Sequence, residues 1–361
     1  MNIVVLSGDN AIADATSSAY NRMYTYSQGV DHMHIITRGN AAQESVITQD
    51  TLSVYIVKAT SKIGAFWKYL RTGLSIIKKI SKENDVVITA QDPFFFGALA
   101  VVLSRLAGGV PVEIQVHGDL EYIVAKSWIR YIMSRYTIMH SQSIRVVSEK
   151  NKEYIATQFP LYSGNVAVLP VLVDATPFRK IASFSLTPHI LVVSRLEKEK
   201  NIQEALHICK DILAHVPTAR LRIAGQGSRE QELLDTARSL DIDTKVEFLG
   251  FRKDIDEVYA DSQILLHTAP AEGFGLVFVE AGLSALPIIG YKSGILPEIS
   301  DMYAVVGDRD ALVRYATAIL SDASLWKEHS ERVHARAQKY IMTPDVYRRS
   351  LVGLWRNMLS S

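Results

Sequence analysis

The stretch HILVVSRLEKEKNIQEALHICKDIL, residues 189–213, contains the pattern that decides the fold. It begins with a short apolar run rich in β-branched side chains, which is typical of a buried strand. A charged loop follows, and from residue 201 the apolar residues recur at helical spacing. A strand, a loop and a helix in this order form the repeating unit of a parallel sheet covered by helices. The stretch therefore predicts a parallel α/β domain.

The same alternation extends through both halves of the chain. Downstream, further strands are expected at 219–227, 245–250, 263–270 and 285–291, with a helix at 228–240. Upstream, strands are expected at 3–8, 32–39, 52–57, 85–90, 110–118, 143–148 and 166–174, with helices at 61–82 and 120–140. Since 361 residues exceed what one core usually serves, we predict two Rossmann-like α/β/α domains.

The expected domain boundaries follow from a break in this pattern. Residues 174–188 contain two prolines and no strong helix or strand signal, which indicates a linker. We therefore place the domains at 1–180 and 181–342. A last helix at 343–361 follows both sheets and is expected as a segment that can pack back on the first domain.

Composition excludes several classes of protein. A net charge of +1 argues against general binding to nucleic acids, and the single cysteine, Cys209, fits a reducing cytoplasm without disulfides. The longest uncharged apolar run, residues 93–104, is shorter than the roughly 20 residues that cross a bilayer. We expect a cytoplasmic globular protein.

Ligands of open parallel sheets bind beyond the carboxyl ends of the strands, so the residues there are the candidate site. Arg195 and Lys200 bracket the loop after residues 189–194, where two cations near a helix N-terminus suit a phosphate. The alternative is a charged loop in which the lysines pair with Glu197 and Glu199. Gly225 follows the next strand; a plain turn explains it equally, because the third glycine of a dinucleotide fingerprint is missing.

The sequence EGFGLVFVE, residues 272–280, follows the strand expected at 263–270. Gly273 and Gly275 expose backbone N–H groups at a helix start, and Glu272 before them is an acceptor for sugar hydroxyls. Glu280 lies two turns into an apolar helix, where a carboxylate is costly unless a donor such as a ribose hydroxyl meets it. The alternative is a first-turn acid and an exposed helix glutamate.

Two strand ends in the first half also carry candidates. His117, with Asp119 nearby, ends the strand expected at 110–118, and a histidine there can orient a substrate or exchange a proton with it. A structural histidine is the alternative. Gly8 and Asp9 end the first strand, where a glycine backbone can approach a phosphate or form an ordinary turn.

Taken in order, SRLEKEKN, GQG, FLG and EGFGLVFVEA resemble the retaining glycosyltransferases of family 4, the group 1 glycosyltransferases. The resemblance is strongest over residues 189–300. It implies the GT-B fold, two Rossmann-like domains facing each other across a cleft, with donor binding in the second. The donor residues that it implies are Gly8, Arg195, Lys200, Gly225, Gly250, Phe251, Arg252, Glu272, Gly273, Phe274, Gly275, Leu276 and Glu280.

The resemblance also implies roles. Glu272 would bind the donor sugar and Glu280 the ribose, while Arg195 and Lys200 would stabilise the departing diphosphate without a metal ion or other cofactor. His117 resembles the histidine close to the transferred sugar, so His117, Arg195, Lys200 and Glu272 form the catalytic set. Asp9, His117 and Asp119 form the acceptor set, although the first loop departs from the family's glycine pair.

The partners are expected to be a nucleotide sugar, with UDP or GDP, and a glycan or lipid-linked glycan. Seven basic residues and no acid lie between Lys58 and Lys82, and residues 122–136 combine aromatic with basic side chains. Both segments are compatible with peripheral association with an anionic membrane. Two other functions remain open: an epimerase or phosphorylase of the same fold, and a sugar-nucleotide-binding subunit without its own activity.

Overall fold

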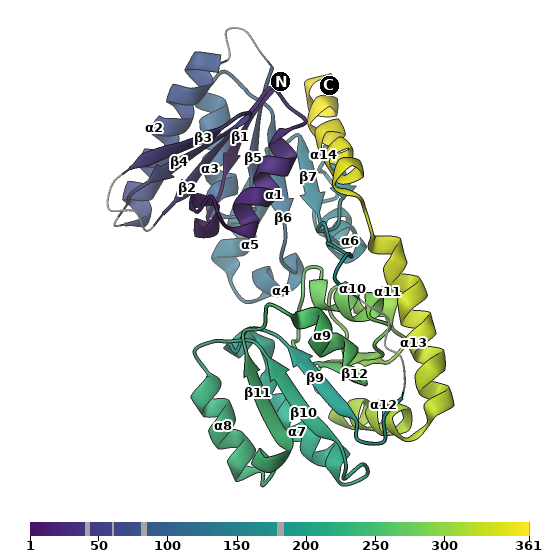
Figure 1. Ribbon diagram of the computed structural model, residues 1–361. Helices are drawn as coiled ribbons and strands as arrows, with labels where there is room; N and C mark the ends of the chain where they lie inside the picture. The colour runs from purple at the N-terminus through teal and green to yellow at the C-terminus, as the bar shows by residue number, and fades with distance from the viewer. Residues whose placement is uncertain (40–43, 60, 81–84, 179–183, 361) are drawn as a thin grey trace. The chain divides into compact units, whose positions relative to one another are not determined.

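The computed structural model describes residues 1–39, 44–59, 61–80, 85–178 and 184–360. Part of the linker predicted at 174–188, residues 179–183, lies outside the described residues, as does Lys82. The chain divides into two compact units, Met1–Pro170 with Met342–Ser361 (unit 1) and Val171–Ile341 (unit 2). Each unit is a parallel sheet flanked by helices (Figure 1).

Unit 1 contains an eight-stranded sheet with the order β3-β4-β2-β1-β5-β6-β7-β8. All pairs are parallel except β3 with β4. The edge strand β3 is largely exposed, which explains why its weak apolar pattern gave no strand prediction. The strands are β1 Asn2–Leu6, β2 His32–Arg38, β3 Ser45–Gln49, β4 Leu52–Val57, β5 Val86–Ala90, β6 Val112–Val116, β7 Ser143–Val146 and β8 Asn165–Val168.

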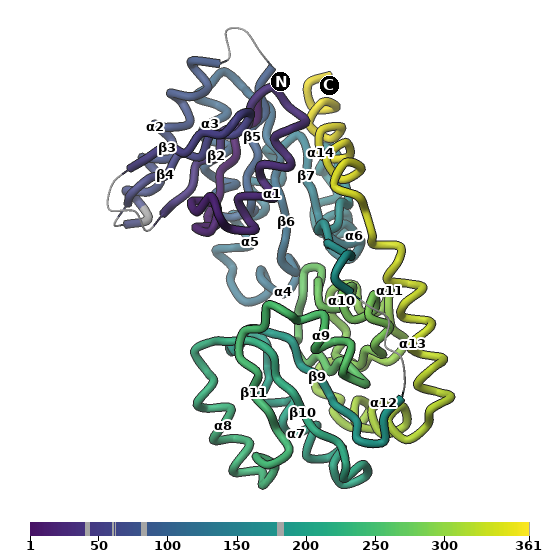
Figure 2. The backbone as a smooth tube through the Cα atoms, in the orientation of Figure 1, coloured from purple at the N-terminus to yellow at the C-terminus, as the bar shows by residue number. Residues whose placement is uncertain are grey.

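The helices of unit 1 are α1 Ser18–Ser27, α2 Lys62–Ile80, α3 Phe95–Leu106, α4 Leu120–Ala125, α5 Trp128–Met139, α6 Glu149–Gln158 and α14 Pro344–Leu359, with a 3-10 turn at Asn10–Ala13. The single helical segment expected at 120–140 is two helices. Ser127 separates them because its extended backbone and its side chain, which accepts from the Arg130 N–H, start α5 anew. In Figure 2 the chain leaves unit 2 along α13 and returns to unit 1 as α14.

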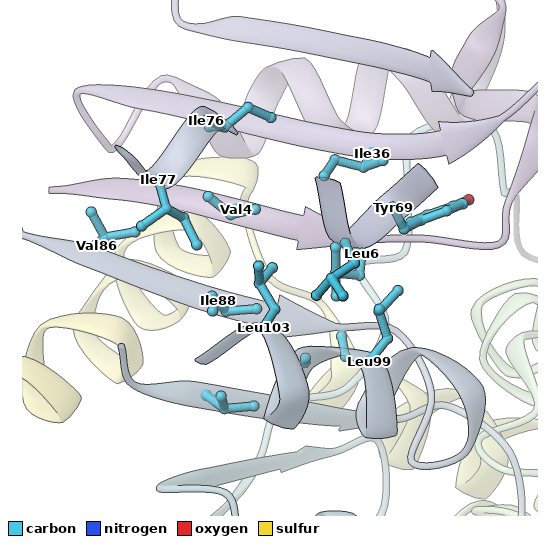
Figure 3. Packing of buried hydrophobic residues seen from close by; sticks show 14 of the residues in the cluster. Val4, Leu6, Ile36, Tyr69, Ile76, Ile77, Val86, Ile88, Leu99 and Leu103 are labelled. Carbon is cyan, nitrogen blue, oxygen red and sulfur yellow. The ribbon is translucent and has the colours of Figure 1, made fainter. Parts of the chain in front are cut away.

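The main core of unit 1 lies between the sheet and helices α2 and α3 (Figure 3). Val4 and Leu6 of β1 and Ile88 of β5 are fully buried, and Leu99 and Leu103 of α3 pack on them. The strands β1 and β5 are almost entirely apolar because both faces of a parallel sheet are covered. This packing fixes the strand ends, where the loops of interest start.

Unit 2 contains a six-stranded parallel sheet with the order β11-β10-β9-β12-β13-β14. Its strands are β9 His189–Val193, β10 Arg220–Ala224, β11 Val246–Gly250, β12 Ile264–His267, β13 Ile288–Tyr291 and β14 Tyr303–Ala304. Its helices are α7 Ile202–Leu213, α8 Glu230–Ser239, α9 Ile255–Ala260, α10 Leu276–Leu283, α11 Leu296–Ile299, α12 Arg309–Ser321 and α13 Ala323–Ala337, with 3-10 turns at Lys198–Lys200, Asp243–Lys245 and Gln338–Tyr340.

Each sheet has one point at which the strand order reverses. In unit 2 the chain moves from β9 outward to β10 and β11 and then returns to the other side of β9 with β12. In unit 1 the corresponding neighbours are β1 and β5. Loops that leave such neighbouring strands diverge and open a crevice, so these two points are where each unit can bind a ligand.

Candidate functional site

The loop after β9 is fastened to the loop after β12 at the reversal point of unit 2. Asn201, which starts α7, has a left-handed backbone with φ 50°. The Thr268 hydroxyl donates to the Asn201 carbonyl at 3.0 Å, and the Asn201 amide donates back to the Thr268 carbonyl at 3.4 Å. These reciprocal bonds hold Lys200, at the end of one loop, beside Glu272 in the other.

Lys200 and Glu272 form the centre of the candidate site. Lys200 Nζ lies 2.5 Å from Glu272 Oε1, and both side chains are more than four-fifths buried. His267, at the end of β12, places Nε2 3.3 Å from the same oxygen. Burial alone would raise the pKa of Glu272, but the ring of His267 and the ammonium of Lys200 outweigh it and lower the pKa to about 2. Glu272 is therefore a carboxylate at neutral pH.

Glu280 of α10 has a different environment. Tyr259, which is fully buried on α9, donates its hydroxyl to Glu280 Oε2 at 2.9 Å. Burial raises the pKa of Glu280, and the hydrogen bond from Tyr259 offsets only part of this effect. A half-buried carboxylate with one satisfied oxygen is poised to accept hydrogen bonds from a ligand's hydroxyl groups.

The glycines of the site allow close backbone approach. Gly275 starts α10 with φ 90°, and Gly294, after β13, has φ 49°. A Cβ on Gly294 would lie 2.3 Å from the Phe274 carbonyl oxygen and 3.1 Å from Glu272 Cβ, so only glycine lets this loop support the Glu272 loop. Gly225, with φ 145°, packs equally tightly, because its Cβ would lie 1.8 Å from the Ser194 carbonyl oxygen.

Arg195 does not contact Lys200 or Glu272 through any hydrogen bond or ion pair of the described residues. It pairs with Glu199 at 3.0 Å, and both side chains are more than half exposed. Glu197 accepts hydrogen bonds from the Ser228 N–H and hydroxyl instead of pairing with a lysine. An exposed pair such as Arg195–Glu199 contributes about 0–1 kcal/mol, so Arg195 can exchange partners easily.

The segment after β11 presents an aromatic side chain to solvent. Gly250 has φ 64°, and the Phe251 side chain is 67% exposed. Arg252 is held by Asp254 through two hydrogen bonds of 2.8 and 2.5 Å. Leu276, at the start of α10, is also exposed, whereas Phe274 is buried. Phe251 is thus available for stacking, while Arg252 is engaged locally.

The predicted residues of unit 1 lie at the ends of β1 and β6. Gly8 passes so close to Phe96 that a Cβ would lie 2.7 Å from its ring, and Asp9 accepts from the Ala11 N–H at 3.0 Å. Asp119 is buried, starts α4 by accepting from the Tyr122 N–H, and pairs with Lys150 at 2.6 Å. These contacts give Asp9 and Asp119 structural roles as caps.

His117, in contrast, lines a cavity of about 130 Å³ together with Gln91, Asp92 and Phe94. Although His117 is an exposed residue, the protein packed around its ring and then the cations of Arg145 and Arg22 lower its pKa. The histidine is thus neutral at physiological pH. Its ring can accept or donate one hydrogen bond at each nitrogen according to its tautomer.

A larger cavity, of about 620 Å³, opens at the reversal point of unit 1. Gly8 of the β1 loop and Asp92 of the β5 loop lie at this point, and the half-buried rings of Phe94, Phe95 and Phe96 form one wall. The guanidinium groups of Arg38 and Arg130 also line the cavity. The arrangement suits a ligand with an apolar part and a negative charge.

The sequence predictions missed several residues of the unit 2 site. The sequence pattern places His267 and Thr268 only within the strand expected at 263–270, and it does not indicate Asn201, Tyr259 or Gly294 as site residues. A signal existed for His267 alone, because it is the polar end of an otherwise apolar strand. Tyr259 and Gly294 act through contacts between distant elements, which no local pattern encodes.

Among the described residues, no group of three or more His, Cys, Asp or Glu side chains could hold a metal ion. No described helix is both long enough and apolar enough to cross a bilayer.

Comparison with known proteins supports the identity of this region. Residues 175–340 match the family of glycosyl transferases group 1. The chain is 30% identical over 165 residues to N-acetyl-alpha-D-glucosaminyl L-malate synthase of Bacillus anthracis, which covers 44% of this chain and 43% of that protein. It is 25% identical over 280 residues to the phosphatidylinositol N-acetylglucosaminyltransferase gpi3 subunit of Schizosaccharomyces pombe, covering 75% and 61%. The matches thus span less than two thirds of either relative.

Solved structures match along nearly the whole chain. Sucrose-phosphate synthase from Thermosynechococcus elongatus superposes with a TM-score of 0.79 at 15% identity, covering 99% of both chains. Anabaena Alr3699/HepE in complex with UDP and glucose superposes with a TM-score of 0.74 at 17% identity, covering 99% and 100%. At these identities the likeness shows the fold, which confirms the predicted GT-B class. Residues 175–340 therefore carry the sequence pattern of the group 1 glycosyl transferases.

Proposed function

We propose that the protein is a retaining glycosyltransferase of family 4 that moves a hexose-type sugar from a nucleoside-diphosphate sugar to a glycan or lipid-linked glycan. The observation that carries this proposal is the Lys200–Glu272 pair at the reversal point of unit 2. It sets a largely buried cation beside a carboxylate that is ionised at neutral pH, and these are the groups needed for a diphosphate and for sugar hydroxyls.

The proposed chemistry begins with an exchange of partners. In the free protein Lys200 and Glu272 neutralise each other. When a donor binds, its diphosphate would form ion pairs with Lys200 and Arg195, and its sugar hydroxyls would donate hydrogen bonds to Glu272. As the anomeric C–O bond breaks, negative charge grows on the leaving phosphate, and the two cations stabilise it without a metal ion. On the retaining route the leaving phosphate accepts the acceptor's proton, so no protein nucleophile is required.

The nucleoside is proposed to lie against Glu280 and the segment after β11. Glu280 has an oxygen that Tyr259 does not occupy, which suits a ribose hydroxyl, and exposed Phe251 suits a base. The names of the two relatives contain the words N-acetyl-alpha-D-glucosaminyl and N-acetylglucosaminyltransferase, and HepE was solved with UDP and glucose. These names favour UDP over GDP and a glucose-type sugar.

The acceptor is proposed to be amphiphilic and anionic. The 620 Å³ cavity of unit 1 pairs an aromatic wall with Arg38 and Arg130. Helices α2 and α5, which both pack on α3, each add residues to the lining of this cavity. The same helices carry five exposed large hydrophobic side chains: Ile63, Trp67, Trp128, Ile129 and Ile132. Such side chains beside basic residues favour peripheral binding to the cytoplasmic face of an anionic membrane.

The test combines nucleotide binding with turnover. A nucleotide that binds only the folded protein raises its melting temperature. We expect UDP, more than GDP or ADP, to raise it with EDTA present, and Glu280→Ala to remove the shift. With a UDP-sugar and a lipid-linked acceptor, release of UDP should require the acceptor, and Lys200→Ala should abolish it. Undiminished transfer by Lys200→Ala would disprove the proposed chemistry.

Two alternatives predict other results in the same assay. An epimerase or a phosphorylase would turn over the donor or a glycan without the acceptor-dependent release of UDP. A binding subunit without its own activity would keep the nucleotide shift and its loss in Glu280→Ala, but would show no turnover with any acceptor.

A further inference from the structure

One face of the unit 1 sheet is buried and yet polar. Along β6 the side chains alternate, so Glu113, Gln115 and His117 share one face, while valine and isoleucine occupy the other. Thr89 of β5 and Arg145 of β7 lie on the neighbouring strands. Glu113 is fully buried and Arg145 is 6% exposed. A buried carboxyl and a buried guanidinium are costly, so their presence calls for a function.

The carboxyl of Glu113 fixes one end of Gln115. Glu113 Oε2 accepts three hydrogen bonds, from the Thr89 hydroxyl at 2.6 Å, from Gln115 Nε2 at 3.2 Å and from Trp355 Nε1 at 3.2 Å. Gln115 Nε2 also donates to the Thr89 oxygen at 2.7 Å. Because these oxygens accept from it, the nitrogen of the Gln115 amide must face Glu113.

Arg145 fixes the other end. Its Nη2 donates to Gln115 Oε1 at 2.5 Å, and its Nη1 donates to the Tyr347 hydroxyl of α14 at 2.9 Å. A guanidinium has no acceptor, so the oxygen of the Gln115 amide must face it. Tyr347 is buried and stacks on Tyr26 of α1 with ring centroids 5.1 Å apart. The orientation of the Gln115 amide is thus determined, because only its oxygen can face Arg145 and only its nitrogen can face Glu113.

The orientation of Gln115 determines the tautomer of His117. Nε2 of His117 lies 2.9 Å from the same Gln115 Oε1 that Arg145 contacts. Since this oxygen only accepts, Nε2 must carry the hydrogen, and Nδ1 of the neutral ring is a bare acceptor. No hydrogen bond to Nδ1 occurs within the described residues.

The network is not arranged for stability alone. Arg145 Nε and Glu113 Oε1 are buried without a hydrogen-bond partner among the described residues. Each such orphaned group costs about 1–3 kcal/mol, and an apolar sheet face would avoid that cost. These polar groups lower the stability of the fold, and their hydrogen bonds lead to one histidine. Their presence is best explained by an effect on the position and protonation of His117.

We propose that Gln115 is a positioning residue that holds His117 as the Nε2–H tautomer, with Nδ1 free to accept a hydrogen bond from a hydroxyl of the substrate. Arg145, which is bound to Tyr347, holds the oxygen of the Gln115 amide. Glu113 holds the nitrogen of the same amide. Helix α14 therefore completes the site of unit 1, although it follows unit 2 in the chain. The inference rests on the proposed function only in naming a sugar or acceptor hydroxyl as the donor to Nδ1.

The test reads the tautomer directly. The full-length protein is labelled with 15N-histidine, and long-range proton–nitrogen spectra identify which ring nitrogen is protonated; His117→Gln assigns the signal. We expect a single Nε2–H tautomer in the native protein. Gln115→Met, which keeps the size of the side chain but removes its hydrogen bonds, should give a mixture of tautomers. Turnover should then fall by on the order of 10- to 100-fold in kcat, with little change in KM for the donor.

Two further variants separate positioning from stability. Gln142→Met is the matched control, because Gln142 accepts from the Val112 N–H at the opposite end of β6. It should lower stability without changing the tautomer. Tyr347→Phe removes one hydroxyl from α14 and provides the same test if Gln115→Met does not fold; it should broaden or split the His117 signal.

A native His117 that is protonated at Nδ1, or a tautomer and kcat that Gln115→Met and Tyr347→Phe both leave unchanged, would overturn the inference. An Nε2–H signal that is lost in the variants of a protein without any transferase activity would uphold the positioning and reject the proposed function. The two failures are thus distinguishable.

Discussion

Lys200 and Glu272 are 72 residues apart in the chain, and their side chains meet at 2.5 Å between Nζ and Oε1. The contact depends on the reversal of strand order between β9 and β12, which brings the two loops together. It also depends on Asn201 and Thr268, which bind one loop to the other. The Lys200–Glu272 pair also affects how the stability of the protein depends on pH.

The stability of the protein should fall in acid through Glu272. Its pKa of about 2 in the folded state lies below the ordinary value of 4.5, so the ionised form stabilises the fold above pH 4.5. This contribution, about 3 kcal/mol, is lost as the pH falls from 4.5 to 2. Urea denaturation of Glu272→Gln should show a deficit at pH 6 that shrinks steadily toward pH 3. A loss of stability that is the same at every pH would contradict the lowered pKa of Glu272. Glu331→Gln, which changes an exposed residue of α13, is the control.

Glu280→Gln should have the opposite effect on the free protein. Burial raises the pKa of Glu280, so the ionised form of its side chain destabilises the fold at pH values above the folded-state pKa. Glutamine can still accept from the Tyr259 hydroxyl. We expect the free variant to be more stable by roughly 1 kcal/mol and to bind nucleotide more weakly. Thermal unfolding with and without UDP measures both effects, and an unchanged UDP shift would contradict the role of Glu280.

Gly225→Ala should destabilise unit 2 strongly. A methyl group there would lie 1.8 Å from the Ser194 carbonyl oxygen, so the loops after β9 and β10 would have to separate. We expect a loss of more than about 3 kcal/mol in urea denaturation and no nucleotide shift. Gly307→Ala is the matched control, since Gly307 also has a positive φ, 97°, but open space around it. Equal losses in the two variants would show that backbone strain alone, and not the close approach, limits Gly225.

Membrane binding should depend on two tryptophans. Trp67 and Trp128 are 54% and 72% exposed, and they belong to α2 and α5, which add residues to the lining of the unit 1 cavity. The double variant Trp67→Ser, Trp128→Ser should bind anionic vesicles at least about tenfold more weakly at low salt, because buried apolar area contributes to interfacial binding. Leu161→Ser, at an 81% exposed position of the same unit, should leave vesicle flotation unchanged. Equal flotation of the double variant and the native protein would show that Trp67 and Trp128 do not contribute to membrane binding.

Much of the fold could be predicted from the sequence because its signals are local. Apolar runs such as residues 190–193 and helical periodicity as in 202–212 identify buried strands and their covering helices. Short strands with little burial, such as β3, carry no such signal. The break at Ser127 was missed, since the apolar spacing continues through it while the cap ends one helix and starts another.

The candidate site shows the same division. Arg195, Lys200 and Glu272 stand at strand ends and belong to recognisable motifs, so they could be selected without a structure. Tyr259 and the polar face of β6 could not, because their roles arise from contacts between elements distant in the chain. In retrospect the alternation of Glu113, Gln115 and His117 was visible, but burial on both faces of a sheet cannot be read from one strand.

Because unit 1 is built from both ends of the chain, its completion must wait for the last segment to be synthesised. As the protein emerges from a ribosome, β5, β6 and β7 appear early, but the α14 residues Tyr347 and Trp355 appear only after all of unit 2. During that interval Arg145 and Glu113 lack their hydrogen bonds to Tyr347 and Trp355. The polar face of β6 can thus be completed only after the whole of unit 2 has been synthesised.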